Sequence, residues 1–476
     1  MGKKRIKKKT IIIGITVIVL LIAAVGGLLC YRSTHISIGG QRYLRSEVSL
    51  EAAVTSDADV QKLTELTQLQ KLDLRSSQLT AGQYDTLHAA LPQCDILWNV
   101  PLLESSYRSD TQELILSVLT DSDLPLMDYF PALTTVDARA CTDYPQLMQL
   151  QELHPELAVL YNVSIGGTYW PQDTAAVKID SATPAELEQA LAYLPALKNV
   201  TISETVTDLE GMYRVQQAYP GVTFSFPLEV CGVMADSSDA DLDLSGISME
   251  NTDALETAVR CMPNLTKVDM CGCGISNEEM EALNNRHEGV LFVWEVQVGF
   301  ITTRTDAETF MPAREGYKVT TADCYNLRYC TELIALDLGH MKITNCDFVA
   351  FMPHLKYLIL ADTPISDFSP LAGLDELIFL EIFMTGIEDY SPLVTLTALE
   401  DLNISYTYGN QEILGQMTWL NRLWWMGGGY AREYLSEKLP NTKLAFNGLS
   451  STGNGWREGQ HYYDMRDIFG MGYMTY

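Results

Sequence analysis

LIALDL at residues 333–338 is followed by LKYLIL at 355–360, LIFLEI at 377–382 and LEDLNI at 399–404, so one pattern returns every 22 residues. Each run has apolar residues at its first, fourth and sixth positions. Because side chains alternate along a strand, positions 4 and 6 share one face, which stacked units bury together. A fixed period of this length indicates a repeat array with a shared core. The sequence therefore predicts a chain that is built to present a surface.

The same pattern continues upstream with a longer period. Runs begin at Leu69, Leu133, Leu197 and Leu265 before the run at Leu333, at spacings of 64, 64, 68 and 68 residues. Their mean, 66, is three times 22, which predicts three strands in each long unit and one array along the chain. Strand-like runs supply the other two strands: ILWNV (96–100), VLYNV (159–163), VTFSF (222–226) and LFVWEV (291–296), then ELILS (113–117), AVKID (176–180) and DLDLS (241–245).

The segments between the strands change character along the chain. TPAELEQALAYLP (183–195) has a cap residue, a proline at the first helical position and a glutamate three residues after the cap, which together predict an α-helix. NEEMEALNNRHEG (277–289) has the same character. ISDFSPLAGL (365–374) and IEDYSPLVTL (387–396) are too short and too broken by proline for an α-helix, and we expect 3₁₀ turns there.

These last segments carry a family resemblance. Residues 365–386 and 387–405 resemble the repeats of bacterial internalin-type leucine-rich repeat proteins, in which an I-x-D-x-S-P-L step joins consecutive strands. The specific motif covers residues 333–410, and less regular leucine-rich repeats extend over about 60–446. The resemblance implies a horseshoe fold and protein recognition at the surface of a Gram-positive bacterium. The chain departs from internalins, since it has no visible C-terminal sorting motif and no immunoglobulin-like module after the repeats, so a host-cell receptor is not carried over.

The expected fold class is α/β: a leucine-rich repeat solenoid, curved like a horseshoe, with a parallel concave sheet, a convex side that is first helical and then 3₁₀, and an N-terminal transmembrane helix. Position 9 of each repeat checks the register, because a buried side chain there must hydrogen-bond the backbone as the chain leaves the strand. Seven of the eight residues at this position suit that role, and Met341 does not: the seven are Ser77, Cys141, Thr205, Cys273, Thr363, Thr385 and Thr407.

The N-terminus predicts where this surface faces. Residues 1–9 carry six basic and no acidic residues, and the uncharged stretch Ile11–Cys30 follows. Twenty helical residues span about 30 Å, the thickness of a bilayer core. Because the positive flank stays cytoplasmic, we expect a single-pass cell-membrane protein with an extracellular C-terminal ectodomain. A cleaved signal peptide and lipoprotein-like processing near Cys30 are the alternatives.

The charge is divided between the tail and the ectodomain. The net charge of the chain is −29 and the tail contributes +6, so residues 10–476 carry −35. Such a surface repels nucleic acid and anionic lipid headgroups. We therefore expect no nucleic-acid partner, and contact with the membrane through the single helix only.

The sequence contains no signature of an enzyme. It lacks H-E-x-x-H, a phosphate-binding loop, a nucleophile elbow and a dinucleotide fingerprint, so no catalytic residue, cofactor or metal is predicted. Cys271 and Cys273 match neither redox nor zinc spacing. A disulfide between Cys324 and Cys330 is left open. The acidic loop 235–246 suggests calcium but lacks the glycine and glutamate of an EF-hand, and a solvated loop is the simpler expectation.

The repeats and their ends divide the chain into six parts. Residues 453–474, GNGWREGQHYYDMRDIFGMGYM, break the repeat, and we expect a C-terminal cap with a short helix over 461–469, because an array needs its last apolar face covered. The parts are a cytoplasmic tail (1–9), a transmembrane helix (10–31), a linker and N-terminal cap (32–60), long-period repeats (61–332), 22-residue repeats (333–446) and the C-terminal cap (447–476).

Positions 3, 5 and 7 of each repeat should project onto the concave face, since positions 4 and 6 point inward. In the downstream repeats these positions carry large apolar residues in a row, which usually marks an interaction site. Two alternatives are that the rings pack on one another and that the C-terminal cap folds back over them. The predicted ligand-binding residues are Tyr357, Ile359, Phe379, Phe383 and Trp424, with Tyr406 one position beyond.

The sequence thus predicts a non-catalytic recognition or adhesion module that binds a protein or peptide outside the cell. One alternative is a scaffold that holds another envelope protein. Another is a protein that binds or processes cell-wall glycan, which two carboxylates about 5 to 10 Å apart beside aromatic side chains would favour.

Overall fold

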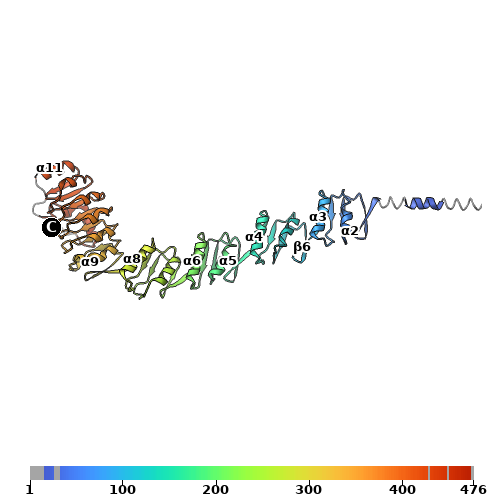
Figure 1. Ribbon diagram of the computed structural model, residues 1–476, viewed down its shortest axis with the longest axis horizontal. Coiled ribbons are helices and arrows are strands. Elements are labelled where there is room, and N and C mark those ends of the chain that lie inside the picture. The colour runs from blue at the N-terminus through green and yellow to red at the C-terminus, as the bar shows by residue number, and fades with distance from the viewer. Residues whose placement is uncertain (1–15, 26–32, 427–428, 447–449, 473–476) are drawn as a thin grey trace, which may run out of the picture. The chain divides into compact units, whose positions relative to one another are not determined.

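The computed structural model describes residues 16–25, 33–426, 429–446 and 450–472 (Figure 1). The chain divides into two compact units: unit 1 is residues 1–203 with 214–224, and unit 2 is residues 204–213 with 225–476. Each unit is a succession of short parallel strands joined by helices or tight turns.

Groups of three parallel strands form the core of the long repeats. The middle strand of each group is the run recognised in the sequence, and its central residue, Leu72, Val136, Val200 or Val268, is at most 1% exposed. This confirms the three parallel strands predicted for each long unit. The groups are β3 (Ser49–Glu51), β4 (Lys71–Asp73) and β5 (Asp95–Leu97); β8 (Glu113–Ile115), β9 (Thr135–Asp137) and β10 (Ala158–Leu160); β13 (Ala176–Ile179), β14 (Asn199–Ile202) and β15 (Thr223–Ser225); and β18 (Asp241–Asp243), β19 (Lys267–Asp269) and β20 (Leu291–Val293).

An antiparallel hairpin precedes every parallel sheet, which the sequence analysis did not predict. Each hairpin is a separate two-stranded sheet, and β16 has in addition one isolated parallel bridge, from Leu228 to Val206. The expectation of one parallel concave sheet is therefore wrong for the long repeats. The turns need left-handed backbone, as at Gly166 and Gly167, whose φ angles are 58° and 71°. The hairpins are β1 (His35–Ile38) with β2 (Gln41–Leu44), β6 (Asn99–Leu102) with β7 (Ser105–Arg108), β11 (Asn162–Ile165) with β12 (Thr168–Pro171), β16 (Pro227–Val230) with β17 (Val233–Asp236), and β21 (Glu295–Val298) with β22 (Ile301–Arg304).

A buried aromatic residue joins the third strand of each group to the next hairpin. The main-chain N–H of Trp98 donates to Ser109 Oγ at 3.1 Å, and the N–H of Ser109 donates back to the Trp98 carbonyl at 2.9 Å. Both residues are buried, so these two hydrogen bonds satisfy buried polar groups at the point where strand pairing changes from parallel to antiparallel. The same two hydrogen bonds recur between Phe226 and Ser237 and between Trp294 and Thr305.

Helices connect the strands of the long repeats and begin at the predicted signals. α5 (Pro184–Leu191) starts after Thr183, whose hydroxyl accepts the Glu186 N–H at 3.2 Å. Its Leu187 is fully buried. α8 (Asn277–Arg286) is confirmed as well, with Ser276 as its cap. The others are α2 (Asp57–Leu63), α3 (Ala81–Ala90), η1 (Leu124–Tyr129), α4 (Tyr144–Leu153), α6 (Leu209–Ala218) and α7 (Asp253–Arg260).

The 22-residue repeats form one seven-stranded parallel sheet in unit 2. Its central leucines, Leu336, Leu358, Leu380 and Leu402, are direct neighbours across the strands and are 0% exposed. Burial of each such side chain contributes about 1.5–3 kcal/mol. The strands are β23 (Thr309–Phe310), β24 (Ala335–Asp337), β25 (Tyr357–Ile359), β26 (Phe379–Glu381), β27 (Asp401–Asn403), β28 (Arg422–Trp425) and β29 (Lys443–Phe446).

Tight turns replace helices between most of these strands. η5 (Ser369–Gly373) and η6 (Ser391–Thr395) are the predicted 3₁₀ turns, each with proline in its first turn. The remaining connections are η2 (Pro312–Glu315), α9 (Thr321–Cys324), η3 (Tyr325–Tyr329), η4 (Asp347–Phe351), α10 (Gln411–Leu414) and α11 (Gly429–Lys438). Beyond β29 lie η7 (Trp456–Glu458) and α12 (Gln460–Ile468), which confirms the predicted C-terminal helix.

Position 9 is a hydrogen-bonding position in most repeats. The Cys273 thiol donates to the Leu244 carbonyl at 3.1 Å and is 1% exposed. Thr205 is the failure: it is exposed, and Val206 is buried instead, because the strand exit is shifted by one residue in this repeat. Thr363, Thr385 and Thr407 donate to the carbonyls of Leu360, Ile382 and Ile404 at 2.7, 2.8 and 2.7 Å.

The N-terminal segment is described only in part. Residues 16–25 are helical and exposed. The remainder of the predicted transmembrane segment, 10–15 and 26–31, lies outside the described residues, as does the basic tail. Within the described ranges, no helix has both the length and the apolar character needed to cross a membrane.

Candidate functional site

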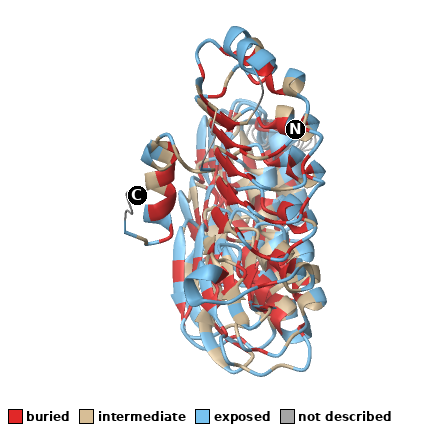
Figure 2. Cartoon of the chain, turned by 90° about the vertical axis from the view of Figure 1, so that its left-hand side faces the viewer, coloured by how far each residue is buried: buried red, intermediate tan, exposed pale blue. Residues whose placement is uncertain are grey.

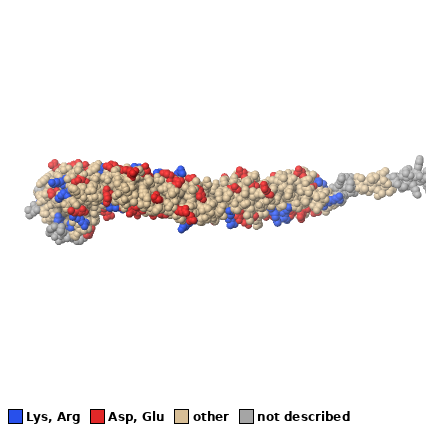
Figure 3. All heavy atoms as spheres, turned by 90° about the horizontal axis from the view of Figure 1, so that it is seen from below, with Lys and Arg blue, Asp and Glu red and all other residues tan. Residues whose placement is uncertain are grey.

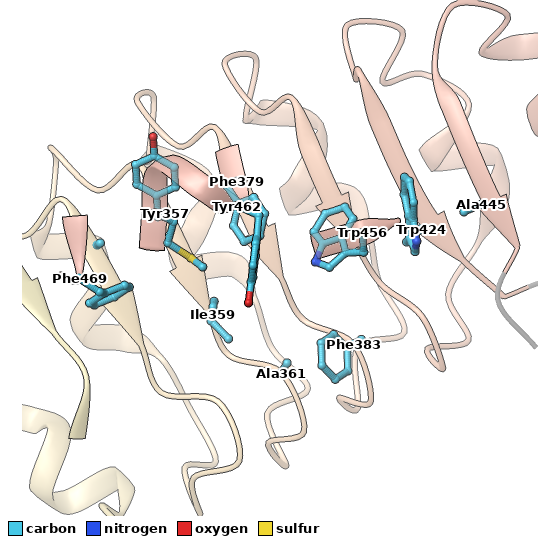
Figure 4. Close-up of a cluster of buried hydrophobic side chains, with 12 residues drawn as sticks. Tyr357, Ile359, Ala361, Phe379, Phe383, Trp424, Ala445, Trp456, Tyr462 and Phe469 are labelled. Atoms are coloured by element: carbon cyan, nitrogen blue, oxygen red, sulfur yellow. The ribbon is translucent and has the colours of Figure 1, made fainter. Parts of the chain in front are cut away.

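The predicted ligand-binding residues lie together on one side of the seven-stranded sheet. Tyr357 and Phe379 are neighbours in register on β25 and β26, with ring centroids 6.4 Å apart, and Trp424 lies farther along on β28 (Figure 4). We call this side, which carries positions 3, 5 and 7 of the 22-residue repeats, the concave face.

The concave face is covered. Five of the six predicted residues are at most 8% exposed, and Tyr406 alone is partly exposed. Residues 450–472, which we call the C-terminal segment, place Trp456, Tyr462, Met465 and Phe469 in the same hydrophobic cluster (Figures 2 and 4). The expectation of a solvent-facing row is therefore wrong, because the apolar row packs against this segment, as one of the two alternatives had it. Binding of a partner by these residues stays a prediction.

Trp456 is the centre of the covered site. Its side chain is fully buried, with ring centroids 5.2 Å from Phe379 and 5.1 Å from Trp424. The Arg422 guanidinium lies 4.6 Å from the Trp456 ring, at a distance suited to a cation–π contact. The indole N–H donates to the carboxyl of Glu381. A residue far along the chain thus packs between side chains of β26 and β28.

Side chains around the concave face also hold the main chain of the segment. Asn403 Nδ2 donates to the Ser451 carbonyl at 2.9 Å, and Trp424 Nε1 donates to the Gly453 carbonyl at 2.8 Å. Arg422 Nη1 donates to the carbonyl of Trp456 at 2.9 Å. At the far end, Arg314 Nη1 of η2 reaches the Phe469 carbonyl at 2.7 Å.

A buried ion pair orients Arg422. Its Nε and Nη2 donate to the two carboxylate oxygens of Asp401 at 2.8 and 2.6 Å, and the Asp401 side chain is 3% exposed. His461 Nδ1 of the C-terminal segment lies 3.1 Å from the same carboxylate. The two-point contact fixes the guanidinium plane against the Trp456 ring.

Two further carboxyl groups lie on the concave face. Burial raises the pKa of Glu381 to about 7, and the charge of Asp337 adds to the rise while the Trp456 indole N–H opposes it. Burial raises the pKa of Asp337 to about 6, against the donation of the Gly339 N–H at 2.9 Å. One strand separates β24 from β26, so their main chains are about 9.6 Å apart.

These three acidic residues were not predicted as part of the site. Asp337, Glu381 and Asp401 alternate with buried leucines, as solvent-facing residues of a strand do, so nothing local distinguished them. The neighbouring repeats did carry one indication, since they have apolar residues such as Tyr357 and Phe379 on the same face. An acid buried among apolar side chains needs a hydrogen-bond donor from elsewhere in the chain.

A row of strained residues borders the concave face at position 8. His340, Asp362, Met384 and Tyr406 have φ between 51° and 61°, the left-handed region that is unfavourable for residues with a Cβ by about 1–2 kcal/mol each. The N–H groups of the first three donate to the next repeat at 2.8, 2.8 and 2.9 Å, which requires this conformation. Tyr406 therefore belongs to the edge of the face and not to the covered row.

The remaining sequence candidates are structural. Cys324 and Cys330 are free, buried thiols. In the acidic loop, Asp239 accepts the N–H of Asp236 at 2.7 Å, and Asp236 accepts the Ser238 hydroxyl at 2.5 Å, so these carboxylates brace their own loop. Among the described residues, no group of three or more His, Cys, Asp and Glu side chains could hold a metal ion. In the view of Figure 3, acidic side chains are spread over the surface with basic ones among them.

No family model matches the chain, and no curated protein sequence matches it. Among solved structures, an internalin from Listeria monocytogenes is 15% identical, covers 86% of this chain and 91% of its own, and has a TM-score of 0.24. A leucine-rich repeat protein from Leptospira interrogans is 17% identical, with 85% and 91% covered and a TM-score of 0.24. The leucine-rich repeat ectodomain of a plant membrane receptor kinase from Arabidopsis thaliana, in complex with Casparian strip integrity factor 2, is 13% identical, with 84% and 46% covered and a TM-score of 0.22.

At these TM-scores the likeness carries no argument about this chain. The fold assignment rests on its own geometry, namely the 22-residue strand spacing, the leucines stacked in register and the hydrogen-bonding position 9. By that geometry the chain is a leucine-rich repeat protein in architecture.

Proposed function

We propose that the chain is a non-catalytic cell-surface recognition or adhesion module that binds a protein or peptide through its strand faces. One observation carries the proposal: the concave face of unit 2 already holds a peptide segment. Asn403, Trp424 and Arg422 each donate to a main-chain carbonyl of that segment. Donors of this kind bind a polypeptide backbone, and the neighbouring slots select its side chains.

The proposal includes a membrane anchor in a Gram-positive cell, with the repeats outside. Its support is the basic tail followed by the uncharged stretch Ile11–Cys30. Protease added to intact cells should then remove the repeats and leave a small membrane-bound fragment. Recovery of most of the full-length protein from the culture medium would contradict the anchor.

The recognition proposal is tested with the full-length chain in detergent as bait for envelope extract, followed by hydrogen exchange on the purified complex. We expect a specific protein partner and new protection on strand faces. Protection limited to the helices and turns would contradict binding through the strands. If a charge-matched control bait captures every protein that the chain captures, the recognition function itself is contradicted. A partner that is itself an envelope membrane protein would identify the chain as an assembly scaffold.

A second candidate is binding or hydrolysis of cell-wall glycan. The observation that favours it is the pair Asp337 and Glu381, two acids with raised pKa values on nearby strands beside Phe379 and Trp424. Against it, Glu381 is 5% exposed beneath Trp456, so no glycan reaches it in this conformation. The candidate gains if the full-length chain releases reducing ends from purified wall glycan and Glu381→Gln abolishes that release.

A further inference from the structure

The C-terminal segment contacts the concave face in the manner of a bound peptide. The hydrogen bonds from Asn403, Trp424 and Arg422 to its main chain are donated by side chains of the sheet. A strand of the solenoid, by contrast, joins its neighbour through a main-chain ladder, as β28 joins β29. The segment is therefore laid across the strands and is held as a ligand would be.

Its apolar residues match the row beneath them. Trp456 packs between Phe379 and Trp424. The buried side of α12 adds Tyr462 and Met465 to the cluster that contains Tyr357 and Ile359, and Phe469, which follows directly after the helix, joins the same cluster (Figure 4). A buried tryptophan surrounded by further apolar contacts has the arrangement of a binding hot spot.

Charged side chains of the segment lie near acids of the concave face. The concave face carries the acids Asp337, Glu381 and Asp401, which occupy strand positions 3 and 5. The charges of Arg466 and Arg457 act on Asp337 and Glu381, and His461 Nδ1 lies 3.1 Å from the Asp401 carboxylate. The segment also carries Glu458, Asp464 and Asp467, so its net charge is not positive. Single basic side chains of the segment therefore lie near the acids, whereas selection of the peptide rests on its aromatic residues.

One position of the segment must be glycine. A Cβ at Gly459 would lie 2.0 Å from Arg422 Nη2, and Arg422 cannot move aside without breaking its contacts with Asp401 and the Trp456 carbonyl. The site is therefore selective for a peptide in which a glycine lies three residues after the tryptophan.

We infer that the concave face of unit 2 is a binding site for a peptide of another protein that carries a Trp-Arg-x-Gly turn followed by a helix with an aromatic stripe, and that residues 450–472 are its built-in occupant. This inference rests on the proposed recognition function and gives its partner a chemical class. Such a peptide can bind only after residues 450–472 leave the concave face, so the peptide and the C-terminal segment compete for the same site.

The test cuts the connection after the protein has folded. A site-specific protease sequence is inserted after Phe446 in the full-length chain, the purified protein is cleaved, and a fluorescent synthetic peptide of residues 450–472 is added. We expect the peptide to replace the cleaved segment and to elute with the protein in size-exclusion chromatography. A Trp456→Ala peptide should bind at least about 30-fold more weakly, and a Gly459→Val peptide should be comparably weak. An Ile468→Ala peptide is the matched control, because Ile468 is 37% exposed and lies outside the cluster, and it should bind as the parent does.

Three outcomes would overturn the inference. The labelled peptide is excluded while the cleaved segment stays bound, or the Trp456→Ala peptide binds as well as the parent, or cleavage unfolds the repeats as judged by far-ultraviolet circular dichroism. The first and third would make the segment part of the core. Partner capture from envelope extract is measured separately, so failure of exchange together with successful capture would leave the recognition function standing and move its site elsewhere.

Discussion

The indole N–H of Trp456 donates to the carboxyl group of Glu381, 75 residues earlier in the chain. Both side chains are buried, and the bond joins the C-terminal segment to the middle of the concave face. A neutral donor satisfies an acid without neutralising its charge, so burial still raises the pKa of Glu381 to about 7.

Packing of the C-terminal segment should weaken as the pH rises. Glu381 and Asp337 have packed-state pKa values of about 7 and 6, above their ordinary values of 4.5 and 3.8. The packed state therefore binds more protons, and this stabilisation is complete below about pH 4 and is lost as the pH rises through 6 to 7. Hydrogen exchange of α12, corrected for intrinsic rates, should show less protection at pH 8 than at pH 5.

The variant Glu381→Gln tests the source of that dependence. Arg457 and Arg422 face Glu381, whereas His340 and Arg466 face Asp337, and these cations limit the effect without reversing it. We expect the variant to lose most of the pH dependence above pH 6. Protection that increases with pH in the parent protein would mean that the acids are paired as ions, contrary to our assignment.

Removal of Arg422 should destabilise unit 2 strongly. In Arg422→Met, the Asp401 carboxylate, whose side chain is 3% exposed, stays buried but loses the arginine that contacts both of its oxygens. The free energy of unfolding should therefore fall by about 3–5 kcal/mol. The double variant Arg422→Met with Asp401→Leu should recover most of this loss, as measured by urea denaturation. Arg45 is the matched control, because its pair with Glu65 is exposed and Arg45→Met should change stability by less than about 1 kcal/mol.

The two hydrogen bonds between Trp98 and Ser109 should stabilise the hairpin of β6 and β7. Ser109→Ala removes the acceptor of the buried Trp98 N–H, which should cost about 1–3 kcal/mol. Faster hydrogen exchange in residues 98–109 is the expected readout. Ser106→Ala, at an exposed position on the same hairpin, should leave exchange unchanged, and equal effects of the two variants would disprove the role of the buried bond.

Cys141 and Cys273 should react slowly with thiol reagents in the folded protein. Both are 1% exposed, and burial raises the pKa of each thiol, so little thiolate is available. Labelling followed by mass spectrometry should show both reacting rapidly only after denaturation. Rapid labelling of Cys273 in the native protein would restore the redox interpretation of the Cys271–Cys273 pair.

The hairpins show why part of the fold escaped prediction. ILWNV reads as one apolar strand, yet Ile96 pairs in parallel with Leu72, whereas Val100 pairs antiparallel with Tyr107. Trp98, between them, is buried as Ile96 and Val100 are. Alternation of side chains is the same for both kinds of pairing, so a run of apolar residues cannot reveal which neighbour its main chain will bond.

The sequence by itself determined the repeat, because the leucines of the 22-residue units and the hydroxyls at position 9, such as Thr385, are set by the local geometry of each coil. It also supplied the aromatic row of Tyr357 and Phe379 as a feature that needed a partner. Only the tertiary structure decided what that partner is. Trp456 and Glu381 meet across 75 residues, and their contact depends on how the segment after β29 returns over the sheet. Periodicity records which face of a strand is apolar, but it carries no record of which distant segment will cover that face.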